Sequence, residues 1–148
     1  VFTMGLPASG KSTVVAQRYP GWTVIDPDVI AEKLLNYDPK RPEATHEIAR
    51  ALAKKAYLTS LGQVEKLVLE TSGTNHRSLL EKVWLAKGAG YRTTLLFVTA
   101  SLEVSLARNR LRARTVPEEV LLRKAQEITK AFEMVQSHVN EVEVVNNG

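Results

Sequence analysis

Cysteine is absent from the 148-residue sequence, which excludes disulfide bonds, thiolate zinc sites and cysteine nucleophiles. No apolar run approaches the roughly 18 residues that a membrane span needs, and no signal peptide opens the chain. Internal repeats and Gly/Ser- or Pro-rich linkers are missing as well. The hydrophobic and charged fractions, 44% and 24%, are ordinary for a globular protein. We therefore expect a single cytoplasmic domain over residues 1–148, with no membrane contact and no obligate protein partner.

Aspartate is scarce, and two of the three aspartates, Asp26 and Asp28, lie two positions apart. The formal net charge is +4 and the sequence pI is about 9.4. Four of the ten arginines fall within seven residues that contain no acid, between positions 108 and 114. Such a cluster favours a polyanionic ligand, a nucleotide or a nucleic acid. A solvated helix face would have the same composition, so the composition alone leaves both possibilities open.

Short β-rich apolar segments alternate with amphipathic segments along the chain. Strands are predicted over residues 1–4, 22–25, 67–69, 93–99 and 142–145. Helices are predicted over residues 11–18, 26–35, 42–61 and 76–88, after Ser101, and from a capping box at 115–118 onward to 135. Trp22 and Trp84 occupy apolar periodic positions, which predicts that both pack in the core. Five strands separated by helices indicate an α/β fold, with a mainly parallel sheet covered on both faces.

The segment from Gly5 to Ser12 satisfies G-x-x-x-x-G-K-[ST] in full, directly after a predicted strand and directly before a helix. Gly5 and Gly10 allow backbone angles that let successive N–H groups point at phosphate oxygens. Lys11 can reach the β- and γ-phosphates, and Ser12 offers its hydroxyl to Mg²⁺. The pattern predicts binding of ATP, or of GTP, together with Mg²⁺. The predicted nucleotide contacts in this segment are Gly5, Pro7, Ala8, Ser9, Gly10, Lys11, Ser12 and Thr13.

The motifs of two other classes of phosphate-loop protein are missing. A GTPase would carry N-K-x-D, and a transporter-type ATPase would carry a signature similar to L-S-G-G-Q; the sequence has neither. A kinase remains favoured. A nucleotide-dependent binding module that transfers nothing also stays open, since it would need the phosphate loop but not Asp28.

The order of the motifs resembles the zeta-toxin-like and polynucleotide-kinase-like P-loop kinases over nearly the whole chain. The resemblance rests on G-L-P-A-S-G-K-S, on V-I-D-P-D after the second strand, on L-E-T-S-G-T after the third, on G-Y-R before the fourth and on R-A-R-T-V-P before the last helix. It implies phosphorylation of a hydroxyl by ATP or GTP. It also implies a three-layer P-loop kinase fold with a five-stranded sheet in the order 2-3-1-4-5.

The second carboxylate of the D-x-D segment, Asp28, accepts the proton of the attacking hydroxyl if the resemblance holds. The carboxyl ends of parallel strands meet at the ligand crevice, so Asp28 and the phosphate loop should converge. A carboxylate there can orient the nucleophile and take its proton. Alternatively, both aspartates simply favour a helix start at Pro27, worth about 0.5–1 kcal/mol each. Asp26 is predicted as the helix cap or as an outer contact to metal-bound water on the substrate side.

The segment after the third strand offers further substrate contacts. The resemblance places a substrate-contacting acid at Glu70, although a strand-end residue facing solvent would fit the bare pattern. Thr71, Thr74 and Arg77 offer hydroxyl and cationic groups to a substrate. The same segment also fits a capped helix start, with Asn75 as the cap.

The arginine segment corresponds to the lid of related kinases. Alternate positions along a helix cannot all face one way, because each residue turns the helix by about 100°. One or two arginines should therefore bind the γ-phosphate through a guanidinium fork, with the others solvated. The resemblance favours Arg114 and then Arg110 as catalytic, with Arg108 and Arg114 also binding nucleotide; Arg112 has no assigned role.

A nucleic-acid hydroxyl, at a 5′ end or on a modified base, is the preferred acceptor because the chain is compact and basic. The alternative is a zeta-toxin-like kinase of a nucleotide sugar, UDP-N-acetylglucosamine. The sequence departs from both patterns. Thr74 replaces the arginine that follows E-G-T-G in the toxins, and residues 29–31 contain no counterpart of the arginine found after the acidic pair in polynucleotide kinases.

Overall fold

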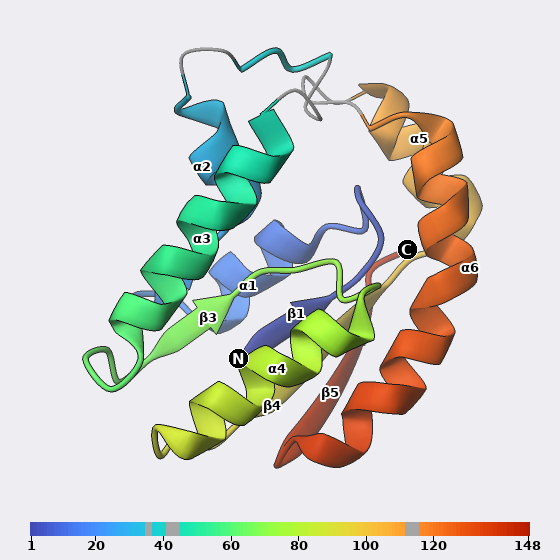
Figure 1. Ribbon diagram of the computed structural model, residues 1–148. Coiled ribbons are helices and arrows are strands. Elements are labelled where there is room, and N and C mark those ends of the chain that lie inside the picture. The colour runs from blue at the N-terminus through green and yellow to red at the C-terminus, as the bar shows by residue number, and fades with distance from the viewer. Residues whose placement is uncertain (35–36, 41–44, 112–115) are drawn as a thin grey trace.

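The computed structural model describes residues 1–34, 37–40, 45–111 and 116–148. A wholly parallel five-stranded sheet carries helices on both faces (Figure 1). The strands are β1 (Phe2–Met4), β2 (Thr23–Ile25), β3 (Leu67–Leu69), β4 (Thr94–Thr99) and β5 (Glu141–Asn146). The α-helices of the described ranges are α1 (Lys11–Arg18), α2 (Pro27–Glu32), α3 (His46–Ser60), α4 (His76–Gly88), α5 (Leu102–Leu111) and α6 (Glu118–Val135). None of these helices is long and apolar enough to cross a membrane.

The strand order is β2-β3-β1-β4-β5, which confirms the order implied by the resemblance. The central strand β1 lies between β3 and β4, with Phe2 paired to Leu69 on one side and to Leu95 on the other. The chain reaches β2 and β3 on one side of β1 before it crosses to β4 and β5. Ligands of open α/β sheets bind at such a reversal, beyond the carboxyl ends of the strands. The segment that follows β1 is the phosphate loop, residues Gly5–Ser12.

The strands are apolar on both faces because both faces are covered. One core joins Leu67 and Leu69 to the layer formed by α3, α4 and α6. The other core joins Val68 of the same strand to Val14 and Val15 of α1. The apolar stripe of α6 faces the first core: Leu121, Ile128 and Val135 are buried, and Ala125 and Phe132 are partly buried.

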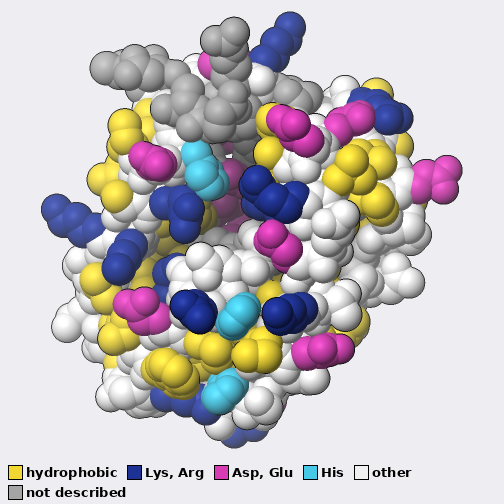
Figure 2. Space-filling model, turned by 45° about the vertical axis from the view of Figure 1, so that its right-hand side comes forward, with side chains coloured by type: hydrophobic (Ala, Val, Ile, Leu, Met, Phe, Trp, Pro, Cys, Tyr) yellow, Lys and Arg dark blue, Asp and Glu magenta, His cyan; other side chains and the backbone are white. Residues whose placement is uncertain are grey.

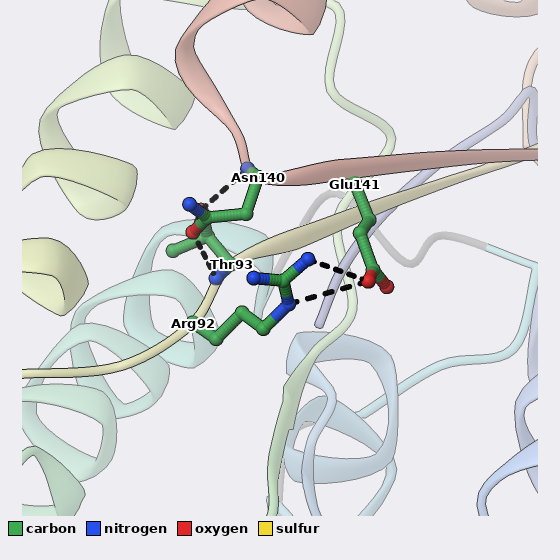
Figure 3. A network of polar contacts seen from close by, with 4 residues as sticks. All are labelled: Arg92, Thr93, Asn140 and Glu141. Carbon is green, nitrogen blue, oxygen red and sulfur yellow. Dashed lines mark hydrogen bonds and ion pairs between the residues drawn. The ribbon is translucent and has the colours of Figure 1, made fainter.

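The amino ends of β4 and β5 are joined by a small polar network (Figure 3). The side chain of Asn140 accepts hydrogen bonds from the backbone N–H of Thr93 at 2.8 Å and from its hydroxyl at 3.0 Å. Arg92 forms an exposed ion pair with Glu141 at 2.7 Å. These contacts fix the start of the parallel pair, where the crossover from α6 must turn into the edge strand.

Two local predictions are wrong. Trp84 is 57% exposed and lies edge-on to the His138 ring, because α4 buries the face of Leu79 and Val83 and position 84 falls beside it. Trp22, in contrast, is half-buried and packs on Tyr19. The capping box also fails, since α6 begins at Glu118 itself and its N-cap is Pro117 rather than Thr115. Thr115 lies outside the described residues.

Candidate active site

The conformation of the phosphate loop depends on its glycines and on its own lysine. A side chain at Gly5 would come within 2.7 Å of the Val98 carbonyl oxygen, and Gly10 has a φ of 91°, a left-handed conformation that favours glycine. Lys11 Nζ donates to the carbonyl oxygens of Gly5 at 2.9 Å and Leu6 at 3.1 Å. The lysine thus already lies across the loop that would surround the phosphates. The neighbouring residues Pro7 and Ala8 are partly buried, and Ser12 and Thr13 are exposed at the start of α1.

The two aspartates occupy different environments. Asp26 is buried and caps α2, its Oδ1 accepting a hydrogen bond from the Asp28 N–H at 2.9 Å. Asp28 is half-buried in the first turn of α2. The predicted cap at Asp26 is therefore present, and Asp28 follows it inside the first turn of α2.

Glu70 links the phosphate loop to the acidic pair. It is 5% exposed, and its Oε1 accepts a hydrogen bond from the Ser12 hydroxyl at 3.1 Å. Burial raises the pKa of Glu70 to about 7, and the neighbouring carboxyl of Asp26 adds to the rise by charge and by hydrogen bonding. Ser12 and Lys11 oppose the rise. A strand-end acid facing solvent is thereby excluded at this position.

The donor set suits Mg²⁺. Magnesium in nucleotide sites takes one or two protein oxygens and fills its remaining positions with phosphate and water. The Ser12 hydroxyl and the Glu70 carboxylate are neighbours at the mouth of the phosphate loop, with Asp26 beside Glu70. In the part of the chain that the structure describes, no group of three or more His, Asp and Glu side chains forms a self-sufficient metal site.

The segment after Glu70 bends back against β1. The Thr71 N–H donates to the Thr3 hydroxyl at 2.9 Å, and the Thr71 hydroxyl accepts from the Gly73 N–H at 2.9 Å. A side chain at Gly73, which has a φ of 76°, would come within 2.5 Å of Met4. The Thr71 hydroxyl therefore holds a turn, and Asn75 caps α4 by accepting from the Ser78 N–H.

Two of the predicted substrate residues, Thr74 and Arg77, line a hollow between the start of α4 and α6. Its volume is about 440 Å³. The hollow is lined by Thr74, Asn75, His76, Arg77, Gln126, Glu127 and Lys130. Figure 2 shows Lys and Arg side chains gathered around a hollowed face of the molecule, with acidic side chains in its depth.

The described arginines of the basic segment point in different directions. Arg108 reaches the phosphate loop, where Nη1 donates to the Ser9 carbonyl at 3.2 Å. Arg110 turns away and forms an exposed ion pair with Glu118 at 2.9 Å. Arg108 thus lies at the phosphate loop, whereas Arg110, predicted as catalytic, points away from it. Arg112 and Arg114 lie outside the described residues.

Sequence reasoning missed two asparagines. Asn147, after β5, donates through Nδ2 to the Ser9 carbonyl at 2.9 Å, and its own carbonyl accepts from Arg108 at 2.6 Å. Buried Asn109 binds both the N–H and the carbonyl of Val116, at 2.9 and 2.7 Å, and so joins α5 to the segment that leads into α6. Single asparagines without a local pattern give no sequence signal for such distant contacts.

A family model described as an AAA domain matches residues 1–135. No curated protein matches the sequence at a significant level. Among solved structures, a chain of the PezAT chromosomal toxin–antitoxin system of Streptococcus pneumoniae is similar with a TM-score of 0.79 and 15% identity, covering 99% of this chain and 66% of that one. The AvrRxo1-ORF1:AvrRxo1-ORF2 complex with sulphate ions matches with a TM-score of 0.70 and 17% identity, covering 97% and 53%.

Deoxyadenosine kinase from M. mycoides with bound dATP is also similar, with a TM-score of 0.61 and 13% identity over 99% of this chain and 90% of that one. The chain thus spans less than two thirds of the toxin-system and AvrRxo1 chains, and most of the nucleoside kinase. At these identities the structural matches establish a shared P-loop kinase-like fold. They agree with the fold that the resemblance implied.

Proposed function

The chain belongs to the AAA domain family, and from this premise we propose that it is a Mg²⁺-dependent kinase that transfers the γ-phosphate of ATP to a hydroxyl. The observation that carries the proposal is the contact between the Ser12 hydroxyl and Glu70 at the mouth of the phosphate loop, beside the acidic pair of α2. A loop that only bound Mg²⁺-nucleotide could also use Ser12 and Glu70, but it would not need the further carboxylate of Asp28 in the first turn of α2.

The phosphate loop and its lysine supply the electrostatic part of the reaction. Backbone N–H groups of residues 5–12 would surround the phosphates, and Lys11 would exchange the carbonyls of Gly5 and Leu6 for phosphate oxygens. Ser12 and Glu70 would hold Mg²⁺, which neutralises charge on the β- and γ-phosphates when bound. Arg108, already at the Ser9 carbonyl, is positioned to add a cation on the nucleotide side.

Asp28 is proposed as the group that takes the proton from the attacking hydroxyl. The hydroxyl oxygen forms a bond to the γ-phosphorus as the bond from that phosphorus to the bridging oxygen breaks, with ADP leaving and the proton passing to the Asp28 carboxylate. Asp26 is less suited to this role, since its Oδ1 accepts a hydrogen bond from the Asp28 N–H and its carboxyl is hydrogen-bonded to that of Glu70. Arg110 and Arg114 stay proposed as catalytic cations, although Arg110 would have to leave Glu118 to reach a phosphate.

The proposed acceptor is a hydroxyl of nucleic acid, a 5′ end or a hydroxyl on a modified base. The net charge of +4 and the Arg77 and Lys130 side chains in the lining of the hollow support a polyanionic acceptor. The alternative is the nucleotide sugar UDP-N-acetylglucosamine. The similarity of the fold to a deoxyadenosine kinase also allows an acceptor of nucleoside size.

A transfer assay with radiolabelled ATP tests the proposal. DNA ends, RNA ends, DNA with hydroxylated bases and UDP-sugars are compared as acceptors, each with wild type and with Asp28→Asn. Label on an acceptor with wild type, lost with Asp28→Asn while ATP binding persists, supports a kinase. ATP binding without transfer to any acceptor would instead favour the nucleotide-dependent binding module.

A further inference from the structure

The segment that follows β5 joins the phosphate loop through Asn147. The Asn147 side chain donates through Nδ2 to the Ser9 carbonyl oxygen at 2.9 Å, and the same oxygen accepts from Arg108 Nη1 at 3.2 Å. Arg108 Nη2 donates to the Asn147 carbonyl at 2.6 Å, and the Asn147 N–H donates to the carbonyl of Thr99, the last residue of β4, at 2.7 Å. One carbonyl of the phosphate loop thus receives two side-chain donors, and the backbone that carries Asn147 is itself anchored to the sheet.

Asn147 packs closely against the loop. A side chain at Gly10 would overlap with Asn147 Nδ2, so the asparagine requires a glycine at this position, as does the φ of 91°. Ser9 is 1% exposed, and its hydroxyl has no partner among the described residues. The Ser9 N–H donates to the Leu6 carbonyl at 3.0 Å within the loop. The carbonyl is therefore the group through which Ser9 is fixed to the rest of the protein.

The two donors on the Ser9 carbonyl set the direction of the next N–H group. The Ser9–Gly10 peptide bond is trans, so the Ser9 carbonyl and the Gly10 N–H point in opposite directions. The carbonyl faces Asn147 and Arg108, and the Gly10 N–H therefore points away from them; it has no acceptor among the described residues. Gly10 directly precedes α1, whose first N–H groups lack partners within the helix and suit phosphate oxygens. The Gly10 N–H extends that set of donors by one.

We propose that Asn147 is a positioning residue, which holds the Ser9–Gly10 peptide so that the Gly10 N–H faces a phosphate oxygen of the bound nucleotide. This inference rests on the proposed function, since it assigns Asn147 a task in the same phosphate loop. If Arg108 leaves the Ser9 carbonyl for a phosphate, Asn147 is the side-chain donor that remains on it. An N–H that already points at its phosphate contributes more to binding than one that must be oriented when the nucleotide arrives.

Asn147→Ala and Asn146→Ala form a matched pair that tests the proposal. Asn147→Ala removes the amide donor but keeps the backbone carbonyl that receives Arg108. Asn146→Ala removes the same amide one residue earlier, where the side chain is exposed and accepts from the Gly148 N–H at 3.2 Å. Calorimetry measures two probes with Mg²⁺ present, the β,γ-imido analogue of ATP and inorganic tripolyphosphate, which carries phosphates without a base or sugar.

Asn147→Ala should weaken both probes by the same factor, about three- to tenfold, because the lost hydrogen bond acts on the phosphates. Asn146→Ala should leave the affinity for both probes as in wild type. A loss for the ATP analogue alone would show that Asn147 acts on the base or the sugar, and would overturn the inference. Unchanged affinities in Asn147→Ala, with a lower free energy of unfolding, would show a purely structural role and would overturn it as well.

The backbone amide of Gly10 gives a readout that needs no nucleotide. In proton–nitrogen NMR spectra of the unliganded protein, the Gly10 resonance should shift and broaden in Asn147→Ala and stay in place in Asn146→Ala, since only the first variant frees the peptide plane. An unchanged Gly10 resonance in Asn147→Ala would overturn the inference. Failure of wild type to bind either probe would count against the proposed function instead, and the Gly10 resonance would still decide whether Asn147 holds the loop.

Discussion

The two ends of the sheet carry similar polar side chains, but the side chains are paired at one end and placed beside like charges at the other. At the amino ends, charges and amides are matched: Arg92 pairs with Glu141, and Thr93 with Asn140. At the carboxyl ends, acid lies beside acid in Glu70 and Asp26. The left-handed Ala8, with a φ of 65°, and a Ser9 hydroxyl that has no partner among the described residues add local cost there. Polar groups with complementary partners stabilise the fold, whereas like charges placed side by side indicate where a ligand of opposite charge would bind.

The largest effect that we expect is a loss of phosphoryl transfer in Lys11→Ala, a variant at the carboxyl ends of the strands. Its amine donates to the carbonyl oxygens of Gly5 and Leu6 within the phosphate loop, so the fold should survive its loss. Transfer should fall on the order of 10²- to 10³-fold, because a cation directed at the transferring phosphoryl group is gone. Single-turnover rates and melting curves measure both effects. A variant that melts normally and transfers at the wild-type rate would refute the role of the loop.

The buried acid pair predicts a pH dependence of stability. Because Glu70 has a raised pKa of about 7 in the folded protein, the folded state holds a proton that the unfolded state releases above about pH 4.5. Stability contributed by Glu70 should therefore be present below pH 4.5 and lost as the pH rises to about 7, on the order of 2–3 kcal/mol. Denaturant unfolding at pH 5 and pH 7.5 measures it. Glu70→Gln should flatten this part of the profile, and an unchanged profile would contradict the pairing.

At the amino end the opposite result is expected. Asn140→Ala leaves the buried Thr93 N–H and hydroxyl without their acceptor and should cost about 1–3 kcal/mol of stability. Binding of the ATP analogue should stay within about twofold, because this network lies at the far end of the strands. Chemical denaturation and calorimetry provide the two readouts. Loss of nucleotide affinity without loss of stability would reverse the contrast between the ends.

The smallest effect that we expect is a change in the pKa of His46. Burial lowers the pKa of this imidazole, and Arg50 and Lys124 lower it further, while Asp28 and Glu47 oppose them. Arg50→Met should therefore move the pKa of His46 upward, and Lys87→Met should leave it unchanged. An NMR titration of the imidazole in both variants tests whether Arg50 lies close to His46; a downward shift of the His46 pKa in Arg50→Met would contradict it.

Features encoded by consecutive residues were predictable from the sequence. The phosphate loop, the Asp26 cap before Pro27 and the strand order implied by the motif order all agree with the structure. Contacts between distant single residues were not: Asn147 on the Ser9 carbonyl leaves no local pattern. Trp84 shows a third case, in which a local pattern exists but the packing of α4 on its Leu79 and Val83 face decides otherwise.

The central claim is that Asp28, and not Asp26, takes the proton at the mouth of the phosphate loop. The most direct measurement is single-turnover phosphoryl transfer at saturating ATP for Asp28→Asn and Asp26→Asn, with melting curves for both. Asp28→Asn should lose about 10²- to 10⁴-fold with little change in melting temperature. Asp26→Asn keeps an oxygen for the Asp28 N–H and should lose much less. Equal losses would show that the two aspartates act as one unit, and a larger loss for Asp26→Asn would contradict the assignment.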